Sequence, residues 1–397
     1  MVILNKKCGD VCINCDKLNF GLKLNYRGCN FMYEHVGLIV LKGFQDRADA
    51  LNNYLCDLLG EKRNYIIDID APRFSNGEAK VQINETVRDK EIYIIADVGN
   101  YSVGYELYGR ENRMSPDDHF LDIVRAISAI SGKARKITLF MPLMYSSRQH
   151  RRKSRESLDC AMALRYLETL GVKNILTFDI HDPEIQNTIP TGSFDSIFPM
   201  YSILKYFIKN EKNEINKDKM VVISPDVGAM ERTKRYASIL NLDLGLYYKR
   251  RDYTRVVNGK NPILQHEYIG PDVEGKDLLI VDDMLSSGDS IIDIVTRMKE
   301  KGCGDIFVIT TFAFFTNGLG KFDELYKKGL IKKVYSTNAS YLNPELDNKE
   351  WFCKIDLTKC MAKVMTCLIQ NQGIANILDS QKKLQKLLNE LNNANKA

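Results

Sequence analysis

Short apolar runs that alternate with helical patterns restrict the fold of this chain more than any other feature of its sequence. From about residue 36, runs rich in Val, Ile, Leu and Phe are separated by stretches in which apolar residues recur every three or four positions. Strands that are separated by helices pair in parallel, because a parallel connection needs a crossover long enough to hold a helix. The pattern starts again after Phe198, so it predicts an α/β fold with two domains, each with a mostly parallel central sheet flanked by helices. We expect strands over 36–41, 92–96, 137–144, 175–178, 220–224, 245–248, 278–281 and 306–311, and helices over 46–60, 116–131, 156–170, 200–209, 228–240 and 288–301.

The length of 397 residues also favours two domains, since a single hydrophobic core stops growing at about 250–300 residues. The clearest helix start is Ser115 as N-cap, with Pro116 at the first helical position. The stretch from Gly99 to Arg113 is expected to be an irregular loop or insertion, and 382–397 a fraying helix. The expected organisation is an N-terminal extension over 1–35, an N-terminal domain over 36–195, a C-terminal domain over 196–345, and a helical segment over 346–397 that packs back on the core.

Composition excludes several classes of partner. The longest apolar stretch, Phe307 to Phe315, is well short of the roughly 20 residues that span a bilayer, so we expect no membrane partner. No sustained apolar segment resembling a secretory signal occurs near Met1, so a cytoplasmic protein is expected. Lys and Arg number 56 against 51 Asp and Glu, and this dispersed charge of +5, with one Trp, predicts no nucleic-acid partner.

Cysteines cluster at the start of the sequence. Ten cysteines in a long chain without an export signal favour reduced thiols over disulfides. Cys12 and Cys15 have the spacing of zinc ligands, and Cys8 and Cys29 are the partners available to complete such a site. Zinc and free thiols both stay open as interpretations.

Paired carboxylates end the apolar strand over 278–281. Asp282 and Asp283 would lie at its carboxyl end, where open parallel sheets bind ligands. The turn from Ser286 to Ser290 then leads into a helix, whose N-terminal N–H groups and hydroxyls form a phosphate cradle. Adjacent acids suit ribose hydroxyls or Mg²⁺. An ordinary N-capped helix is the alternative, and the motif alone does not decide between them.

Two further strand ends and two basic clusters extend this pattern. Asp226 follows the strand over 220–224, and His181 follows the strand over 175–178, although a lone histidine is more often a hydrogen-bonded loop residue. Five Lys or Arg residues fall between Arg148 and Arg155, and Lys249–Arg251 with Arg255 form the second basic cluster. Each cluster is equally consistent with a solvated face or with phosphate binding. The sequence contains no P-loop, dinucleotide G-x-G-x-x-G, H-E-x-x-H or G-x-S-x-G motif, which argues against four large enzyme classes.

In combination these motifs resemble the ribose-phosphate pyrophosphokinase family, also called phosphoribosyl pyrophosphate synthetases. The resemblance covers roughly residues 36–380 and identifies the chain as a divergent member with an N-terminal extension. It implies two phosphoribosyltransferase-like domains. The matching segments are Phe74–Glu78, Val81–Arg88, Arg148–Gln149, Asp179–His181 with Gln186, Ser224–Asp226, Lys249–Arg251 and Val281–Met284.

The family resemblance implies transfer of the diphosphoryl group of ATP to the 1-hydroxyl of ribose 5-phosphate, which forms 5-phosphoribosyl 1-diphosphate and releases AMP. It also implies a homo-oligomer, a dimer or hexamer, because the adenine site is completed by a neighbouring subunit in that family. The basic loop 148–155 is expected to close over ATP and exclude water. The implied ATP-binding residues are Phe74, Asn76, Glu78, Arg148, Gln149 and His150. The implied ribose 5-phosphate residues are Arg251, Asp282, Asp283, Ser286, Ser287, Gly288, Asp289 and Ser290. One or two Mg²⁺ ions would be held by His181 and Asp226, and Lys249, Arg251 and Arg148 would stabilise the transition state.

Three positions depart from the family pattern. His150 stands where the family usually has an acid, and Ser286 replaces an acid in the phosphate loop. Asp289 stands where a glycine is usual, and its repulsion of a phosphate would cost about 1 kcal/mol unless the carboxylate points away. These departures leave a non-catalytic regulatory paralogue as an alternative. A phosphoribosyltransferase is a weaker one, because Phe74–Glu78 and Arg148–Gln149 argue against it.

Overall fold

The computed structural model describes residues 33–152, 154–211, 215–216, 218–251, 263–378 and 381–394. The side chains of 249–251 and 263–266, and of several positions near the C-terminus, are outside this description. The chain divides into the units Met1–Glu34 and His35–Ala397, and the fold below is that of the second unit. The predicted zinc ligands lie outside the described residues, so a zinc site stays a prediction: they are Cys8, Cys12, Cys15 and Cys29.

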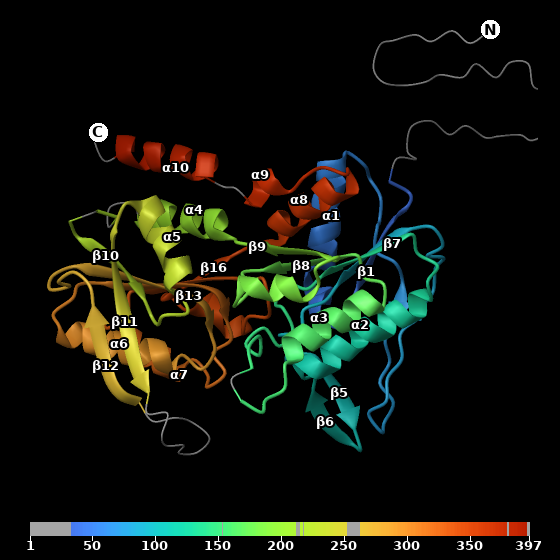
Figure 1. Cartoon of the computed structure of the whole chain (residues 1–397), viewed down its shortest axis with the longest axis horizontal. Helices are drawn as coiled ribbons and strands as arrows, with labels where there is room; N and C mark the ends of the chain where they lie inside the picture. The colour runs from blue at the N-terminus through green and yellow to red at the C-terminus, as the bar shows by residue number, and fades with distance from the viewer. Residues whose placement is uncertain are drawn as a thin grey trace, which may run out of the picture. The chain divides into compact units, whose positions relative to one another are not determined.

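Five parallel strands form the first sheet, in the spatial order β1-β4-β7-β8-β9 (Figure 1). One face of this sheet packs on helices α2 and α3. This packing buries the apolar stripe that each of the two helices carries. Ser115 and Asp118 form a reciprocal capping box at the start of α2, with Pro116 next, so the predicted helix start is confirmed. The strands are Val36–Val40 (β1), Glu91–Ile95 (β4), Lys136–Phe140 (β7), Asn174–Phe178 (β8) and Ser193–Ile197 (β9), and the helices are Ala48–Leu59 (α1), Pro116–Ile130 (α2) and Asp159–Thr169 (α3).

Seven strands form the second sheet, in the order β12-β11-β10-β13-β14-β15-β16. Every neighbouring pair is parallel except β11 with β12, which form an antiparallel ribbon at one edge. The strands are Met220–Ser224 (β10), Asp243–Arg251 (β11), Ile263–Ile269 (β12), Asp277–Leu285 (β13), Ile306–Ala313 (β14), Lys333–Thr337 (β15) and Phe352–Ile355 (β16). The helices are Met200–Glu211 (α4), Met230–Leu240 (α5), Asp289–Glu300 (α6), Gly320–Lys327 (α7), Thr358–Ile369 (α8), Ala375–Leu378 (α9) and Gln381–Ala394 (α10).

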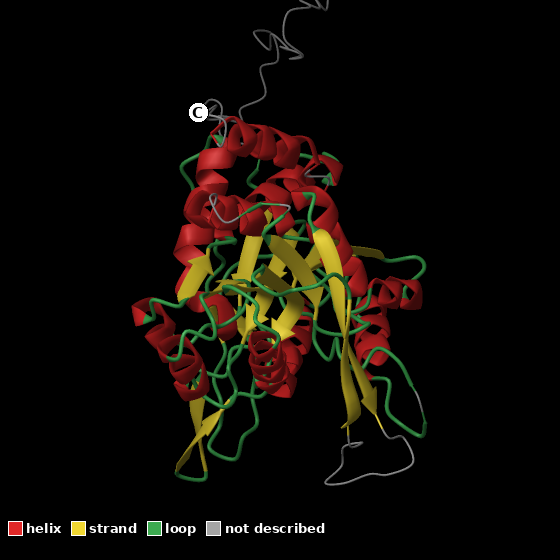
Figure 2. Cartoon of the chain, turned by 90° about the vertical axis from the view of Figure 1, so that its left-hand side faces the viewer, coloured by secondary structure: helices red, strands yellow, loops and turns green. Residues whose placement is uncertain are grey.

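Helices lie on either side of the central strands, as Figure 2 shows. On one face of the second sheet, Leu278 and Ile280 of β13 pack in a core with Ile291 and Ile294 of α6. The intervening residue Leu279 is also fully buried, so β13 is covered on both faces, as expected for a parallel strand with an unbroken apolar run. The predicted fold class, two α/β domains with mostly parallel sheets, is confirmed.

Strands of the two sheets extend past two of the predicted domain boundaries. Strand β9, Ser193–Ile197, pairs with β8, so the first sheet extends past residue 195. Strand β16, Phe352–Ile355, pairs with β15, so the second sheet extends past residue 345. Each lies at the edge of its sheet, with a neighbour on one side only, and an edge strand tolerates polar residues that hide its pattern in the sequence.

The stretch from Gly99 to Arg113 is not an irregular loop throughout. It contains the antiparallel hairpin of β5, Gly104–Leu107, and β6, Arg110–Arg113. Tyr108 and Gly109 between the strands both have positive φ, the geometry of a tight two-residue hairpin turn. Most of the hairpin is exposed, so it lacks the apolar alternation that would have predicted it.

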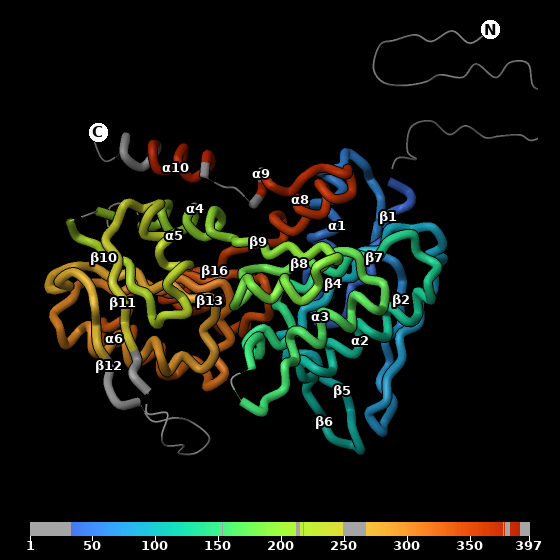
Figure 3. Tube along the Cα trace, viewed as in Figure 1, coloured from blue at the N-terminus to red at the C-terminus, as the bar shows by residue number. Residues whose placement is uncertain are grey.

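The C-terminal segment packs on elements from both halves of the chain. Helix α8 lies against α1, although nearly 300 residues separate them, and α10 lies against α4 and α5 (Figure 3). Helix α10 covers Gln381–Ala394, close to the predicted range 382–397. In the part of the chain that the structure describes, no helix is long and apolar enough to cross a membrane.

Candidate active site

The carboxyl ends of strands from both sheets bring the predicted acidic residues together. His181, just after β8, lies with Nδ1 2.6 Å from Oδ2 of Asp283, in β13. The two residues are 102 positions apart and belong to different sheets. We call His181, Asp226, Asp282 and Asp283 the strand-end cluster.

The contact with His181 sets the charge of Asp283. Burial raises the pKa of this carboxyl, but the hydrogen bond from His181 and the nearby guanidinium of Arg232 lower it further, so its pKa falls below the usual range. The same hydrogen bond raises the pKa of His181 above its ordinary value, against the effect of burial. The pair therefore favours an imidazolium bound to a carboxylate.

The neighbouring Asp282 behaves in the opposite way. Burial and the charge of Asp283 raise the pKa of Asp282 well above the usual range, and the carboxylate of Asp226 adds to that effect. Asp226 is itself exposed, and its Oδ1 accepts a hydrogen bond of 2.9 Å from the backbone N–H of Ala229, before α5. These carboxylates are close enough to repel one another, so a bound cation would favour their ionised forms.

A buried arginine that the sequence reasoning missed lies beside this cluster. Arg232, in the first turn of α5, places Nη2 2.8 Å and Nε 3.0 Å from Oδ1 of Asp179. Oδ2 of Asp179 accepts a hydrogen bond of 2.5 Å from the hydroxyl of Thr311, in β14. Burial raises the pKa of Asp179, whereas Arg232 lowers it. An Arg one helical turn past a strand end was the only signal in the sequence, because its partner is 53 residues earlier.

Asp179 also has an unusual backbone. Its φ of 38° is in the left-handed region, which a residue other than glycine adopts at a cost of about 1–3 kcal/mol. The contacts with Arg232 and Thr311 hold it there. This turn leads directly from β8 to His181, so the arginine positions the histidine that meets Asp283.

The turn after β13, which the sequence predicts to bind a phosphate, leads into α6 through a glycine. Gly288 has a φ of 83° and precedes the first residue of α6, and a side chain at this position would collide with the ring of Phe322. Asp289 brings a negative charge to this turn. Its Oδ1 lies 2.9 Å from Nζ of Lys321 in α7. Lys321, which the sequence reasoning also missed, offsets the repulsion that Asp289 would exert on a phosphate.

The start of the basic loop is held by local contacts. Gln149 donates a hydrogen bond of 2.8 Å from Nε2 to the backbone carbonyl of Ser157, which links the two ends of the loop. His150 lies with Nε2 3.2 Å from Oδ2 of Asp182, and Arg151 places Nη2 2.7 Å from the same oxygen. His150, which the sequence predicts to bind ATP although it departs from the family pattern, therefore binds an acid that directly follows His181.

A cavity of about 380 Å³ joins the basic loop to the phosphate turn. Arg148 lines it from the first half of the chain, and Ser286 and Thr316 line it from the second half. Arg148 is exposed and close enough to His181 to lower the pKa of that histidine. The structure thus brings together predicted ATP-side and ribose-side residues.

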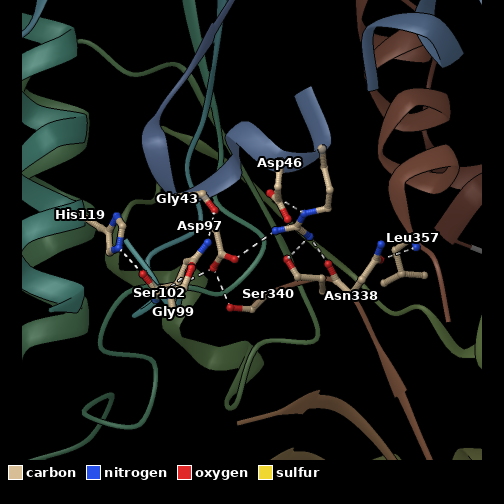
Figure 4. Close-up of polar contacts among 12 residues, drawn as sticks. Gly43, Asp46, Asp97, Gly99, Ser102, His119, Asn338, Ser340 and Leu357 are labelled. Carbon is tan, nitrogen blue, oxygen red and sulfur yellow. Dashed lines mark hydrogen bonds and ion pairs between the residues drawn. The ribbon is translucent and has the colours of Figure 1, made fainter. Parts of the chain in front are cut away.

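A buried polar network supports the wall of this cavity at Gly99 (Figure 4). Oδ1 of Asp97 accepts hydrogen bonds from the backbone N–H of Gly99, at 3.0 Å, and from the hydroxyl of Ser340, at 2.6 Å. Oδ2 of Asp97 lies 3.1 Å from Nη2 of Arg47, whose Nη1 also donates to the backbone carbonyl of Asn338. Burial raises the pKa of Asp97, and Arg47 and Ser340 lower it. The network connects the first and last parts of the described chain.

Replacing Ser340 with Ala is expected to lower the free energy of unfolding by about 1.5–3 kcal/mol, because a hydrogen bond to a buried carboxylate is lost. Urea unfolding followed by circular dichroism measures the effect. Ser128→Ala, at an exposed position in α2, is the matched control and should have little effect. Equal unfolding midpoints for the two variants would contradict the role of Ser340.

Three predicted ATP-binding residues are not brought to this cavity by the described part of the chain. Phe74, Asn76 and Glu78 form an exposed turn that bonds within itself, with Asn76 Nδ2 3.0 Å from Oε2 of Glu78. The tip of the β5–β6 hairpin packs on this turn, where the N–H of Tyr108 donates to the carbonyl of Ser75. Among described residues, no hydrogen bond or ion pair links the turn to the strand-end cluster. Such a position fits a turn that serves another subunit, and that role stays a prediction.

Two predicted catalytic residues have only their backbone described. Lys249 and Arg251 end strand β11, with Lys249 opposite His266 of β12, and their side chains lie outside the described part.

The predicted pair of metal ligands, His181 and Asp226, is not part of a ready metal site: no set of three or more His, Cys, Asp or Glu side chains in the described ranges is arranged to hold an ion.

Comparison with known proteins shows the same family in both halves of the chain. Residues 44–171 match the family model "N-terminal domain of ribose phosphate pyrophosphokinase", and residues 193–349 match the phosphoribosyl transferase domain. The ribose-phosphate pyrophosphokinase of Buchnera aphidicola is 30% identical over 268 residues, which cover 66% of this chain and 75% of the relative. The enzyme of that name from Vibrio parahaemolyticus is 28% identical over 313 residues, or 78% of this chain and 90% of the relative.

A solved structure shares the fold. The phosphoribosylpyrophosphate synthetase from Mycobacterium smegmatis aligns with a TM-score of 0.65 and 21% identity, over 85% of this chain and 99% of that one. The two family models span parts of both α/β halves, and the second includes Asp226, Asp282 and Asp283. The chain therefore belongs to the ribose-phosphate pyrophosphokinase family.

Proposed function

We propose that this chain synthesises 5-phosphoribosyl 1-diphosphate from ATP and ribose 5-phosphate and releases AMP. The observation that carries the proposal is the cavity in which Arg148 of the first half faces Ser286 of the phosphate turn in the second half. A diphosphoryl transfer needs little covalent help from the protein and much neutralisation of phosphate charge. A cation opposite a phosphate cradle is the arrangement that this chemistry requires.

In the proposed reaction, the 1-hydroxyl oxygen of ribose 5-phosphate attacks the β-phosphorus of ATP. The new bond joins that oxygen to the β-phosphorus, the bond from the β-phosphorus to the α,β-bridging oxygen breaks, and AMP leaves with the bridging oxygen. The proton of the hydroxyl is released. The Ser286–Ser290 turn would hold the 5-phosphate, and Asp282 and Asp283 would accept hydrogen bonds from the ribose hydroxyls, which orients the attacking oxygen.

Arg148 would stabilise the negative charge that builds up on the transferred group. Gln149 and His150 hold the first turn of the basic loop in place through Ser157 and Asp182. Lys249 and Arg251 stay proposed partners in this role, as do Phe74, Asn76 and Glu78 for the adenine ring of a neighbouring subunit. A homo-oligomer and a cytoplasmic location also stay predictions.

Magnesium fits the donor set of the strand-end cluster. Mg²⁺ in phosphate-transfer sites usually takes one or two carboxylates, with water and substrate phosphates as the other ligands. Asp226 is exposed, and burial together with the charges of Asp283 and Asp226 raises the pKa of Asp282, so a further cation would favour its ionised form. One or two bound Mg²⁺ ions, held by Asp226 with Asp282, or with His181 once its imidazolium has lost a proton, would neutralise the phosphates of ATP.

The structure also bears on the regulatory alternative. Ser286 and Asp289 were the strongest reasons to expect a non-catalytic paralogue, and the ion pair with Lys321 offsets the charge of Asp289. The strand-end cluster and Arg148 keep the groups that the reaction needs, which favours an active enzyme.

Release of AMP from ATP tests the proposal. The purified protein is expected to form AMP only when ribose 5-phosphate and Mg²⁺ are both present, in amounts equal to the 5-phosphoribosyl 1-diphosphate formed. Omitting ribose 5-phosphate or adding a chelator should abolish the signal. Binding of both substrates without AMP formation would overturn the proposal and support the regulatory role.

A further inference from the structure

A second polar cavity, of about 340 Å³, lies among helices that the proposed reaction does not use. Residues of α1, α4, α8, α9 and α10 line it, and these helices gather above the sheets in the view of Figure 3. Phe198, in the segment that follows β9, lines both this cavity and a neighbouring one that contains His181. We call it the helical cavity.

Four lysines converge on the helical cavity from three helices. Lys359 and Lys363 lie one turn apart on α8 and so share a face, Lys205 comes from α4, and Lys383 comes from α10. Lys205, Lys359 and Lys363 form no ion pair with an acidic side chain in the described residues. Asp356 is the one acid among the described lining residues, which leaves a net charge of 4 − 1 = +3.

Asp356, the one acid among the described lining residues, already accepts hydrogen bonds from other groups. Oδ1 of Asp356 accepts hydrogen bonds of 2.8 Å from the N–H of Thr358 and 2.7 Å from Nδ2 of Asn338. Burial raises the pKa of Asp356, but these hydrogen bonds lower it further, so it stays ionised at the start of α8. It therefore serves the helix terminus, and most of the lysine charge is not compensated within the cavity.

Two of these lysines lie near the thiol of Cys360. Lys363 and Lys383, from different helices, both lie close enough to Cys360 to lower its pKa, although burial raises it overall to about 11. Lys359 Nζ lies 5.6 Å from the centre of the Tyr54 ring, on the opposite wall. Like charges gathered in a concave site repel one another, and an anion in that site relieves the repulsion.

We propose that the helical cavity binds a small molecule that carries a diphosphate group. A diphosphate brings two to four negative charges, which match the net charge of the cavity, and its length suits lysines placed on facing helices. The volume is within the range of small-molecule sites. Tyr54 and Phe198 give the cavity an apolar side that a planar ring of a diphosphate ester could cover. The site is separate from the proposed catalytic residues and does not depend on their function.

Titration calorimetry with inorganic pyrophosphate at low ionic strength, without Mg²⁺, tests this site. Because the phosphate turn is a competing site, the background protein carries Ser287→Asp, which places a carboxylate in that turn. This protein is expected to bind one pyrophosphate, and adding Lys359→Gln and Lys363→Gln should weaken that binding at least tenfold. A parallel titration with ADP distinguishes a free diphosphate from its ester, and binding of either one that depends on these lysines supports the site.

A matched control removes the same two charges elsewhere. Lys133→Gln with Lys301→Gln, both exposed and more than 50 positions in sequence from every residue that lines the helical cavity, should leave the affinity within twofold. Lys205→Gln, on a different helix, should weaken binding about threefold or more, so the conclusion does not depend on α8 alone. No pyrophosphate binding by the Ser287→Asp protein, or equal affinity in the cavity and control variants, would overturn the proposal. Neither result depends on whether the chain releases AMP.

Discussion

Replacing Arg232 with Met is expected to lower the free energy of unfolding by about 3–5 kcal/mol, because it leaves the carboxylate of Asp179 buried without its cation. Arg232 is nearly buried, and Asp179 is 5% exposed. Burial lowers the pKa of the guanidinium, but Asp179 and Asp283 raise it above its ordinary value, so the charge is held firmly. Urea unfolding followed by circular dichroism measures the change.

Two further variants separate the buried charge from a loss of packing. Arg297→Met removes a half-exposed arginine from an ion pair with Asp293 in α6, and should cost about 0.3–0.5 kcal/mol. Combining Arg232→Met with Asp179→Asn removes both charges, and should recover part of the stability. A loss for Arg232→Met no larger than that of Arg297→Met would show that the buried pair does not stabilise the fold.

Replacing Arg148 with Ala is expected to lower kcat by about 10²–10³, the effect of removing one preorganised donor to developing charge. Because Arg148 is exposed, the free energy of unfolding should change little. Rates of AMP formation at saturating ATP and ribose 5-phosphate give kcat, and their dependence on each substrate gives KM. A loss in kcat with a smaller change in KM indicates an interaction made mainly in the transition state.

The control for this variant is an arginine on the same half of the chain. Arg165→Ala, exposed on α3, should leave kcat within twofold. Arg148→Lys keeps the charge but loses the planar guanidinium, and it should recover part of the rate. If Arg148→Ala raised only KM, the arginine would bind ATP without stabilising the transition state. An unchanged kcat/KM would remove it from the mechanism.

Buried strands were the elements that the sequence predicted best. The apolar run of β13 is unbroken because both of its faces are covered, and that requirement is visible in the order of the residues. The start of α2 was equally clear, since Ser115 and Asp118 satisfy each other's backbone N–H groups within four residues. Edge strand β9 and the exposed β5–β6 hairpin were missed, because neither needs an apolar pattern, and the buried strand β15 was missed as well.

The residues of the candidate site also divide into those that the local sequence predicted and those that it did not. Asp282, Asp283 and the Gly288 turn are adjacent in the chain, so strand and helix patterns were sufficient to place them. Arg232 and Lys321 act on residues 53 and 32 positions away, and nothing in their local sequence indicates a partner. The same holds for the lysines of the helical cavity, whose helices are far apart in the chain.

By itself, the sequence determined two α/β halves, the strand ends that carry the acids, and the family. These features depend on local order, because burial and capping act over a few residues. Only the tertiary structure decided that His181 meets Asp283, that Lys321 offsets the charge of Asp289, and that Arg148 shares a cavity with Ser286. Electrostatic balance in a buried site depends on distances in space, and packing brings together residues that the chain keeps far apart.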